Sequence, residues 1–141
     1  MMNSLKAIYD ILENINRSIN NKEDMLIQNL KDPIFGKILR KVLDYMTNPK
    51  YSFQIKQIKY CVYFDDPIAS ENQNVNSIFK MLDYLIEKEG NPSDEEIAFL
   101  EKISSSDMET VEVVTRILIK FPGCGLTNER IAEILEDQNV K

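Results

Sequence analysis

The chain has 141 residues, 43% of them hydrophobic and 28% charged, with a formal net charge of −6. This length and composition suit one domain over residues 1–141. The sequence contains no stretch of about 18 apolar residues and no charged-then-apolar leader, so we expect neither a membrane span nor a signal peptide. The chain has no histidine, so it offers no Ser-His or Cys-His nucleophile pair and no imidazole metal ligand. Its two cysteines, Cys61 and Cys124, are far apart in the sequence and give neither a disulfide framework nor the spacing of a metal site. We therefore expect a cytoplasmic, non-enzymatic domain without a cofactor.

Apolar spacing predicts an all-α fold of about seven or eight helices. The first helix has an apolar residue every three or four positions, which defines one buried face. This face consists of Leu5, Ile8, Leu12, Ile15 and Ile19. A short second helix is expected around Met25, Leu26, Ile27 and Leu30.

A third helix is expected to begin at Asp32, with Asp32 as the N-cap and Pro33 at the first helical position. Asn48 and Pro49 would end it. Its inward face would consist of Ile34, Ile38, Val42 and Tyr45.

The next stretch, from Ile58 to Phe64, is rich in β-branched and aromatic residues and fits either a helix end or an extended strand. A long loop from Asp65 to Asn76 is expected after it, a length that is uncommon in loops without a function.

Three more helical segments follow this loop. The first carries Ile78, Leu82, Leu85 and Ile86, and Gly90 would stop it. Ser93 and Glu96 form a capping box for the second. An apolar stripe marks the third, at Val111, Val114, Ile117 and Leu118.

Residues 116–134, RILIKFPGCGLTNERIAEI, predict a helix that stops in a glycine-tight turn and a second helix that starts at once. Two of the four glycines, Gly123 and Gly125, lie here, and they indicate a positive φ angle or a close approach of the backbone to another group. Thr127 or Asn128 can cap the second helix. Its unpaired N–H groups and the positive end of its dipole would form an anion site for a carboxylate or a phosphate.

Arg116 and Lys120 lie four residues apart on one side of the helix before the turn, so they would add positive charge to this anion site. The simpler alternative is an ordinary helix–turn–helix corner in which Cys124 is a small core residue.

The charges are distributed unevenly along the chain. Residues 61–115 hold three basic and thirteen acidic residues, a balance of −10, whereas residues 31–60 hold seven basic and two acidic residues, a balance of +5. The net charge opposes nucleic-acid binding, but this distribution indicates one face available to DNA and one turned away from it. The alternative is that both segments are merely solvated helix faces. The seven basic residues are Lys31, Lys37, Arg40, Lys41, Lys50, Lys56 and Lys59.

The glycine turn resembles a motif near the end of the N-terminal helical domain of ATP-dependent DNA ligases, nearest to the bacteriophage type. In that motif, an apolar helix with basic residues leads into Cys-Gly-x-Ser/Thr and a short helix with a central Ile. Cys124, Gly125 and Thr127 match the central residues. The other matches are Arg116 and Lys120 before the turn and Ile131 and Ile134 after it.

Two further stretches extend the resemblance over most of the chain. LRKVLDYMTNPKYSFQIK, from Leu39 to Lys56, is similar to a helix and basic segment in the first half of the ligase domain. The stretch from Ser77 to Ser106 follows the order of a helix, an acidic loop and another helix.

The sequence also departs from the ligase pattern. Lys120, Phe121 and Pro122 stand where an Arg-Asp-Leu is usual, so the aspartate's salt bridge is missing, and the segment from Gln57 to Asn74 is longer than its counterpart. There is no Lys-x-Asp-Gly, the site at which ligases carry AMP on a lysine, so we do not expect this chain to ligate by itself.

The resemblance implies a non-catalytic domain that binds duplex DNA around a nick through its phosphate backbone, without sequence preference, in DNA replication and repair. In the ligases this domain lies against the minor groove and completes a clamp with the nucleotidyltransferase and oligonucleotide-binding domains, so a ligase catalytic core in cis or in trans is the implied protein partner. A phage-encoded protein would act in the host cytoplasm. The DNA-binding residues expected are Arg40, Lys41, Lys50, Lys56, Lys59, Arg116, Lys120, Gly123, Gly125, Leu126, Thr127 and Asn128.

A second hypothesis is a helical protein-interaction module. Its acidic face, from Asp83 to Glu112, would dock on a basic partner. The adjacent acidic pairs Asp65/Asp66 and Glu95/Glu96 are expected to be solvated surface and not catalytic dyads.

Overall fold

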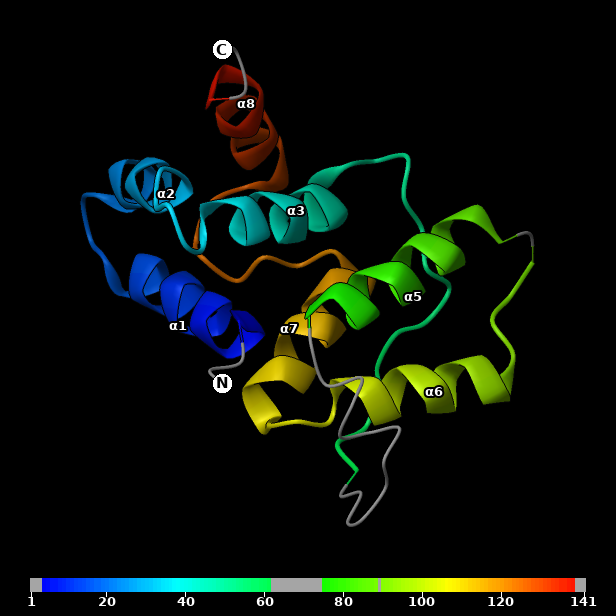
Figure 1. The fold of residues 1–141 in the computed structure, drawn as a ribbon. Coiled ribbons are helices and arrows are strands. Elements are labelled where there is room, and N and C mark those ends of the chain that lie inside the picture. Colours follow the sequence, from blue (N-terminus) through cyan, green and yellow to red (C-terminus); the bar gives the residue numbers. More distant parts are fainter. Residues whose placement is uncertain (1–3, 62–74, 89, 139–141) are drawn as a thin grey trace.

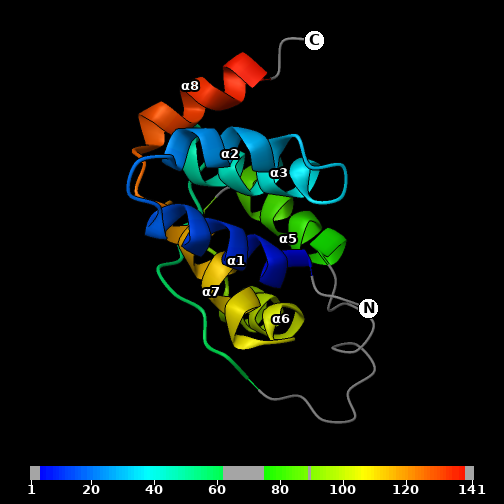
Figure 2. The same cartoon turned by 90° about the vertical axis from the view of Figure 1, so that its left-hand side faces the viewer.

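The computed structural model describes residues 4–61, 75–88 and 90–138, and within these ranges the chain is all-α, with seven helices and no strand (Figure 1). This confirms the fold class expected from apolar spacing. Helix α3 packs against α2, α7 and α8, while α1 packs chiefly against α7, and α6 joins α5 to α7 (Figure 2). The helices are α1 (Ser4–Arg17), α2 (Lys22–Leu30), α3 (Gly36–Thr47), α5 (Val75–Glu87), α6 (Asp94–Ser104), α7 (Met108–Ile119) and α8 (Asn128–Gln138).

Helix α1 buries the predicted face fully at Leu5, Ile8, Leu12 and Ile15. The prediction is wrong for Ile19, because α1 already ends at Arg17 and Ile19 is 89% exposed. The ammonium group of Lys22 occupies this end of the helix and donates hydrogen bonds to the carbonyls of Asn16 and Ser18. These bonds satisfy carbonyls that the end of a helix leaves without a partner.

Helix α3 begins at Gly36, three residues later than the predicted first helical position, Pro33. Asp32 does not cap it, because the Asp32 carboxylate accepts hydrogen bonds from the N–H groups of Ile34, at 2.7 Å, and Phe35, at 2.9 Å. These bonds stabilise a separate turn before the helix, as aspartate side chains commonly do. A Cβ atom on Gly36 would lie 2.4 Å from the Leu30 carbonyl oxygen, so glycine lets the start of α3 touch the end of α2.

The late start also changes which residues of α3 face the core. Val42 and Tyr45 are buried as predicted and Ile38 is half-buried, but Ile34 lies before the helix and is 71% exposed. Three residues of α3 that were not predicted as core, Leu39, Leu43 and Met46, are also fully buried.

Residues 51–61 form an irregular segment, so Ile58 to Cys61 belong to neither a helix nor a strand. Phe53, Ile55 and Ile58 are buried in the core. The N–H of Lys59 donates to a Glu101 carboxylate oxygen at 2.9 Å, which ties the segment to α6. Residues 62–74, and with them most of the predicted loop, lie outside the described residues, whereas Asn76 already belongs to α5.

The predicted capping box at the start of α6 is confirmed. Ser93 Oγ accepts from the Glu96 N–H at 3.1 Å, and Glu96 Oε1 accepts from the Ser93 N–H at 2.8 Å. Glu96 also accepts hydrogen bonds from the Tyr84 hydroxyl and the Lys88 ammonium group, which joins α5 to α6. The expectation of a solvated pair therefore holds for the exposed Glu95 but is wrong for Glu96.

Both cysteines are free, with Cys124 buried and Cys61 partly buried. Within the described ranges, no group of three or more acidic or cysteine side chains could hold a metal ion. None of the helices in this part of the chain has the length and apolar character needed to cross a bilayer.

The Glu96 network predicts an acid-sensitive contribution to stability. Hydrogen bonds from Lys88, Tyr84 and the Ser93 backbone lower the pKa of Glu96 from its ordinary value of 4.5 to about 2. Because this pKa is lower in the folded state, the network's contribution is present above pH 4.5 and is lost as the pH falls from about 4.5 to 2. We expect Glu96→Gln to lower stability at pH 7 and to flatten its pH dependence over that interval, as measured by urea unfolding.

The matched control is Glu95→Gln, which removes a neighbouring carboxylate that makes no hydrogen bond in the described part of the chain. An equally steep acid dependence in the parent and Glu96→Gln proteins would contradict the prediction.

Candidate nucleic-acid interface

Helix α7 stops at Lys120 and not at a glycine. Lys120 has a left-handed backbone, with φ +60°. Its N–H donates to the Ile117 carbonyl at 3.1 Å and the next N–H, of Phe121, donates to the Arg116 carbonyl at 2.9 Å, which is the Schellman pattern of a helix end. A residue other than glycine rarely adopts this backbone. Here the Lys120 ammonium group donates to the carbonyls of Asn48 and, at 2.9 Å, Tyr51, and these bonds offset the strain.

Gly123 and Gly125 both have the predicted positive φ, at +69° and +86°. The close approaches that require glycine are to side chains of the same protein. A Cβ on Gly123 would lie 2.7 Å from Arg116 Nη1, and one on Gly125 would lie 2.7 Å from Lys22 Cε. Lys22 fills the space that a Cβ on Gly125 would need, so a contact within the protein is enough to require glycine at this position.

Thr127 caps α8, since its hydroxyl accepts from the Arg130 N–H at 3.1 Å. The other predicted cap, Asn128, instead donates through its side chain to the Lys120 carbonyl at 3.1 Å and so ties α8 to the turn. The N–H groups of Thr127, Asn128 and Glu129 find no hydrogen-bond acceptor in the described part of the chain, so this helix end keeps the donors that an anion could use.

The core side of the turn matches the simpler alternative given above. Cys124 and Ile131 are fully buried and Ile134 is 2% exposed. Burial raises the pKa of the Cys124 thiol, so the cysteine is a packing residue and not a reactive thiolate.

Arg116 is bound internally and offers little charge to a ligand. Its guanidinium group contacts Glu13 on α1 at 3.0 Å and Glu112 on α7 at 2.9 Å, and it lies 5.3 Å from the centre of the Tyr9 ring. It also donates to the Pro122 carbonyl at 3.4 Å. Because the Arg116 side chain is only 11% exposed, the expectation that it adds free charge beside the turn is wrong.

The Lys120 side chain is engaged in the same way, in its two bonds to the carbonyls of residues 48 and 51. Partial burial lowers the pKa of this ammonium group. Lys120 is therefore also a structural residue and not a free cation.

The turn borders a hollow of about 590 Å³ that opens at the start of α8. All five predicted residues of the turn, including the half-buried Leu126, lie on this hollow. Glu13 also borders it, but its charge is paired with Arg116. The lining residues are Glu13, Asn16, Arg116, Phe121, Pro122, Gly123, Gly125, Leu126, Thr127 and Asn128.

Three predicted lysines, Lys50, Lys56 and Lys59, are exposed, and their ammonium groups make no ion pair or hydrogen bond within the described ranges. Phe53, Ile55 and Ile58 point into the core, so the lysines between and beside them face solvent. The Lys120 ammonium group bonds to the carbonyls of Asn48 and Tyr51 and so joins the start of the irregular segment to the turn before α8, and from there the segment runs on to α6 (Figure 1). We call Lys50, Lys56, Lys59 and the α8 amide groups of residues 127–129 the turn face.

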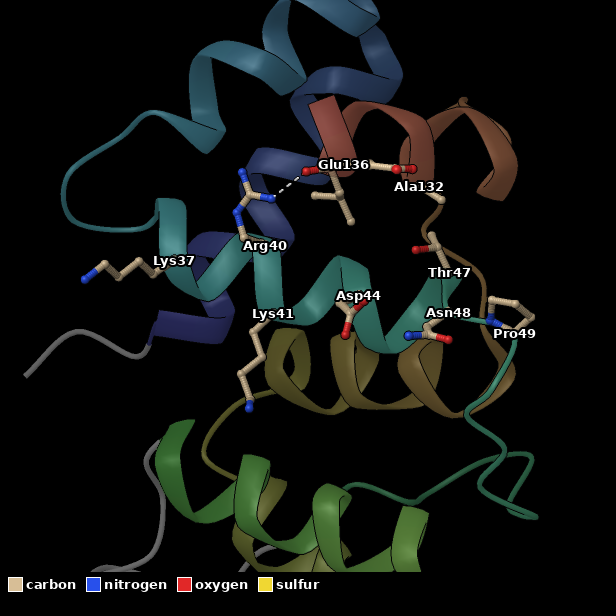
Figure 3. Close-up of a pocket in the computed structure, with 10 residues that line it drawn as sticks. Lys37, Arg40, Lys41, Asp44, Thr47, Asn48, Pro49, Ala132 and Glu136 are labelled. Atoms are coloured by element: carbon tan, nitrogen blue, oxygen red, sulfur yellow. Dashed lines mark hydrogen bonds between the residues drawn. The ribbon is translucent and has the colours of Figure 1, made fainter. Parts of the chain in front are cut away.

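Arg40 and Lys41 lie apart from the turn face, on α3. Arg40 donates to the Leu135 carbonyl near the end of α8 at 2.9 Å, and Lys41 lies 3.8 Å from Asp83 on α5. Both border a hollow of about 630 Å³ between α3 and α8, in which Figure 3 shows Arg40 turned toward α8 and Lys41 toward α5. Asp44 and Glu136 also line this hollow, so its charge is mixed and it suits a phosphate less well than the turn face.

Phe121, which was not among the predicted site residues, is 57% exposed and borders the hollow at the turn. The available signal was an aromatic residue directly before the Pro122 of a glycine-rich turn.

No protein-family model matches the sequence, and no curated protein matches it. A solved structure named Pmar-Lig_PreS3 is similar to this chain, with a TM-score of 0.71 and 17% sequence identity over 92% of this chain. At this identity the likeness establishes a shared fold alone. The chain spans 29% of that structure's length.

The two exposed glycines with similar φ angles give a test of the turn. Gly90 has φ +87° and nothing within 4 Å of an added Cβ, whereas Gly125 has φ +86° and Lys22 in the way. Gly90→Ala should therefore cost only backbone strain, about 1 kcal/mol. Gly125→Ala should cost about 2–3 kcal/mol in urea unfolding, because it also displaces Lys22 from the carbonyls at the end of α1.

In a Lys22→Ala background the extra cost of Gly125→Ala should disappear. Equal losses for the two glycine variants in the parent protein would show that Lys22 does not need the space at Gly125.

Proposed function

We propose that this chain is a non-catalytic helical domain that binds duplex DNA around a nick through the phosphate backbone, as part of or related to an ATP-dependent DNA ligase. The observation that carries the proposal is the turn face, in which three exposed lysines, whose ammonium groups pair with no acidic side chain of the described ranges, accompany the unpaired amide groups of α8, while Lys120 joins residues 48 and 51 to the turn. Lysine ammonium groups and helix N-terminal amides are the donors that proteins use to hold phosphate.

A net charge of −6 does not by itself prevent a locally basic surface from meeting DNA. The chain also shares its fold with Pmar-Lig_PreS3, and the 'Lig' in that name is consistent with a ligase.

The proposal implies weak, salt-sensitive binding with little sequence preference, because the turn face has contacts for about four phosphates. We expect the logarithm of the association constant to fall against the logarithm of salt concentration with a slope of about −4, measured by fluorescence anisotropy with a labelled nicked duplex. Replacing Lys50, Lys56 and Lys59 together by Gln should reduce this slope to about −1 and weaken binding at low salt.

In the control variant, three exposed lysines outside the turn face, Lys6, Lys31 and Lys80, are replaced by Gln. These replacements change the net charge by the same amount. This variant should bind like the parent. Equal weakening in the two triple variants would mean that overall charge, and not the turn face, controls binding. No binding of the parent at low salt would refute the proposed function.

A hollow of about 430 Å³ between α5 and α6 favours the second hypothesis, docking on a basic partner. It exposes Tyr84, 49%, and Phe99, 42%, beside Glu95 and Glu96. Carboxylates around exposed aromatic rings suit a lysine or arginine side chain on a partner protein.

For this second function we expect a fluorescent peptide of alternating Lys and Leu to bind to the protein. The double variant Phe99→Ser, Glu95→Lys should bind this peptide at least about tenfold more weakly, because one aromatic contact and one charge pair are lost. A peptide with Glu in place of Lys is the control. Equal binding of the two peptides would exclude recognition through charge.

A further inference from the structure

The turn face has an apolar component that phosphate binding leaves unused. The Phe121 side chain is 57% exposed and borders the hollow that Thr127 and Asn128 also line. The neighbouring Ile119 is 48% exposed. A single exposed apolar residue is ordinary on a protein surface, but Phe121 differs in how it is held and in what surrounds it.

The backbone holds Phe121 in a fixed position. Its N–H donates to the Arg116 carbonyl at 2.9 Å, the Lys120 before it is anchored through its side chain, and the Pro122 after it is buried with a fixed φ. An added Cβ on Gly123 would lie 3.3 Å from the edge of the Phe121 ring, so the turn itself packs against one side of the ring. The phenyl group is thus presented to solvent in a rigid turn.

The surroundings of the ring indicate which partner covers it. Lys120 bonds to residues 48 and 51, and this places Lys50 beside the turn. Thr127 and Asn128, at the start of α8, line the same hollow as the ring. An apolar ring flanked by phosphate donors has the composition of a minor-groove surface, in which apolar side chains enter between base steps while cations hold the backbones.

A wedge of this kind distinguishes nicked from continuous DNA. Entry of a ring between two base pairs requires that step to unstack and the duplex to kink, which costs free energy in proportion to the stiffness of the step. At a nick one backbone is interrupted, so the step opens and bends more easily than in a continuous duplex. The gain from the ring contact is the same in both cases, but the cost is smaller at the nick.

We infer that the Phe121 ring enters the minor groove at the interrupted base step and is the residue that makes binding selective for nicked over continuous duplex DNA. This inference rests on the proposed function, because it assigns nick selectivity to a surface whose lysines supply only sequence-independent and nick-independent attraction.

The test compares the dissociation constants of a nicked and a continuous duplex of the same sequence. The parent should prefer the nicked duplex. Phe121→Ala should weaken binding to the nicked duplex about 5- to 100-fold, bring the ratio of the two constants toward one and leave the salt slope unchanged. Phe121→Leu, an apolar wedge of smaller size, should retain part of the preference.

The matched control is Phe99→Ala, which removes an exposed phenylalanine of α6 and should keep both the affinity and the ratio. A 2-aminopurine base placed beside the nick should brighten when the parent binds, because unstacking relieves its quenching, and should brighten less with Phe121→Ala. Circular dichroism spectra should be the same for all variants.

An unchanged ratio in Phe121→Ala, with the parent bound to DNA, would overturn the wedge and leave the proposed function standing. Loss of affinity for both duplexes in equal proportion would also overturn it, since the ring would then be a general contact. No binding of the parent to either duplex would overturn the proposed function as well, so the two failures are distinguishable.

Discussion

The end of α7 depends on one buried cation, Arg116. Its guanidinium group joins Glu13 on α1, Glu112 on α7 and the Pro122 carbonyl of the turn. A guanidinium group removed from water is stable only when its donors are satisfied, so these partners must stay in place together. The turn must also leave room for the group, which Gly123 does because it has no Cβ. The direction in which the chain leaves α7, and hence the place where α8 begins, follows from this packing.

The buried cation explains why the basic residues of this acidic chain have two different roles. Lys22, Arg116 and Lys120 all point into the protein and bind carbonyl or carboxylate oxygens near the turn. Their charges hold helix ends and loops together and are not available to a ligand. Lys50, Lys56 and Lys59 lie on an irregular segment whose apolar residues take the inward positions. What this segment offers to solvent is therefore mostly polar, with Tyr60, 40% exposed, as the aromatic exception.

Local patterns in the sequence were sufficient for much of the fold. The buried face of α1 from Leu5 to Ile15, the capping box at Ser93 and Glu96 and the positive φ of both turn glycines depend on neighbouring residues, and these predictions are confirmed. Errors arose where a distant group decides. The roles of Arg116 and Lys120 depend on residues more than 60 positions away. Spacing along one helix contains no information about such partners.

The turn face has few contacts with which to bind DNA, and this limits the affinity that it can reach by itself. Three lysines and one helix end supply sequence-independent attraction that salt screens readily, so binding through them alone is weak. Weak contacts become effective when they are linked to others on the same duplex, because the second binding event then occurs at a high local concentration. A surface used in this way needs a fixed geometry more than a high affinity of its own. The bonds of Arg116, Lys120 and Asn128 across the turn supply that geometry, since they position the α8 amide groups, the Phe121 ring and the Lys50 loop relative to one another before any ligand arrives.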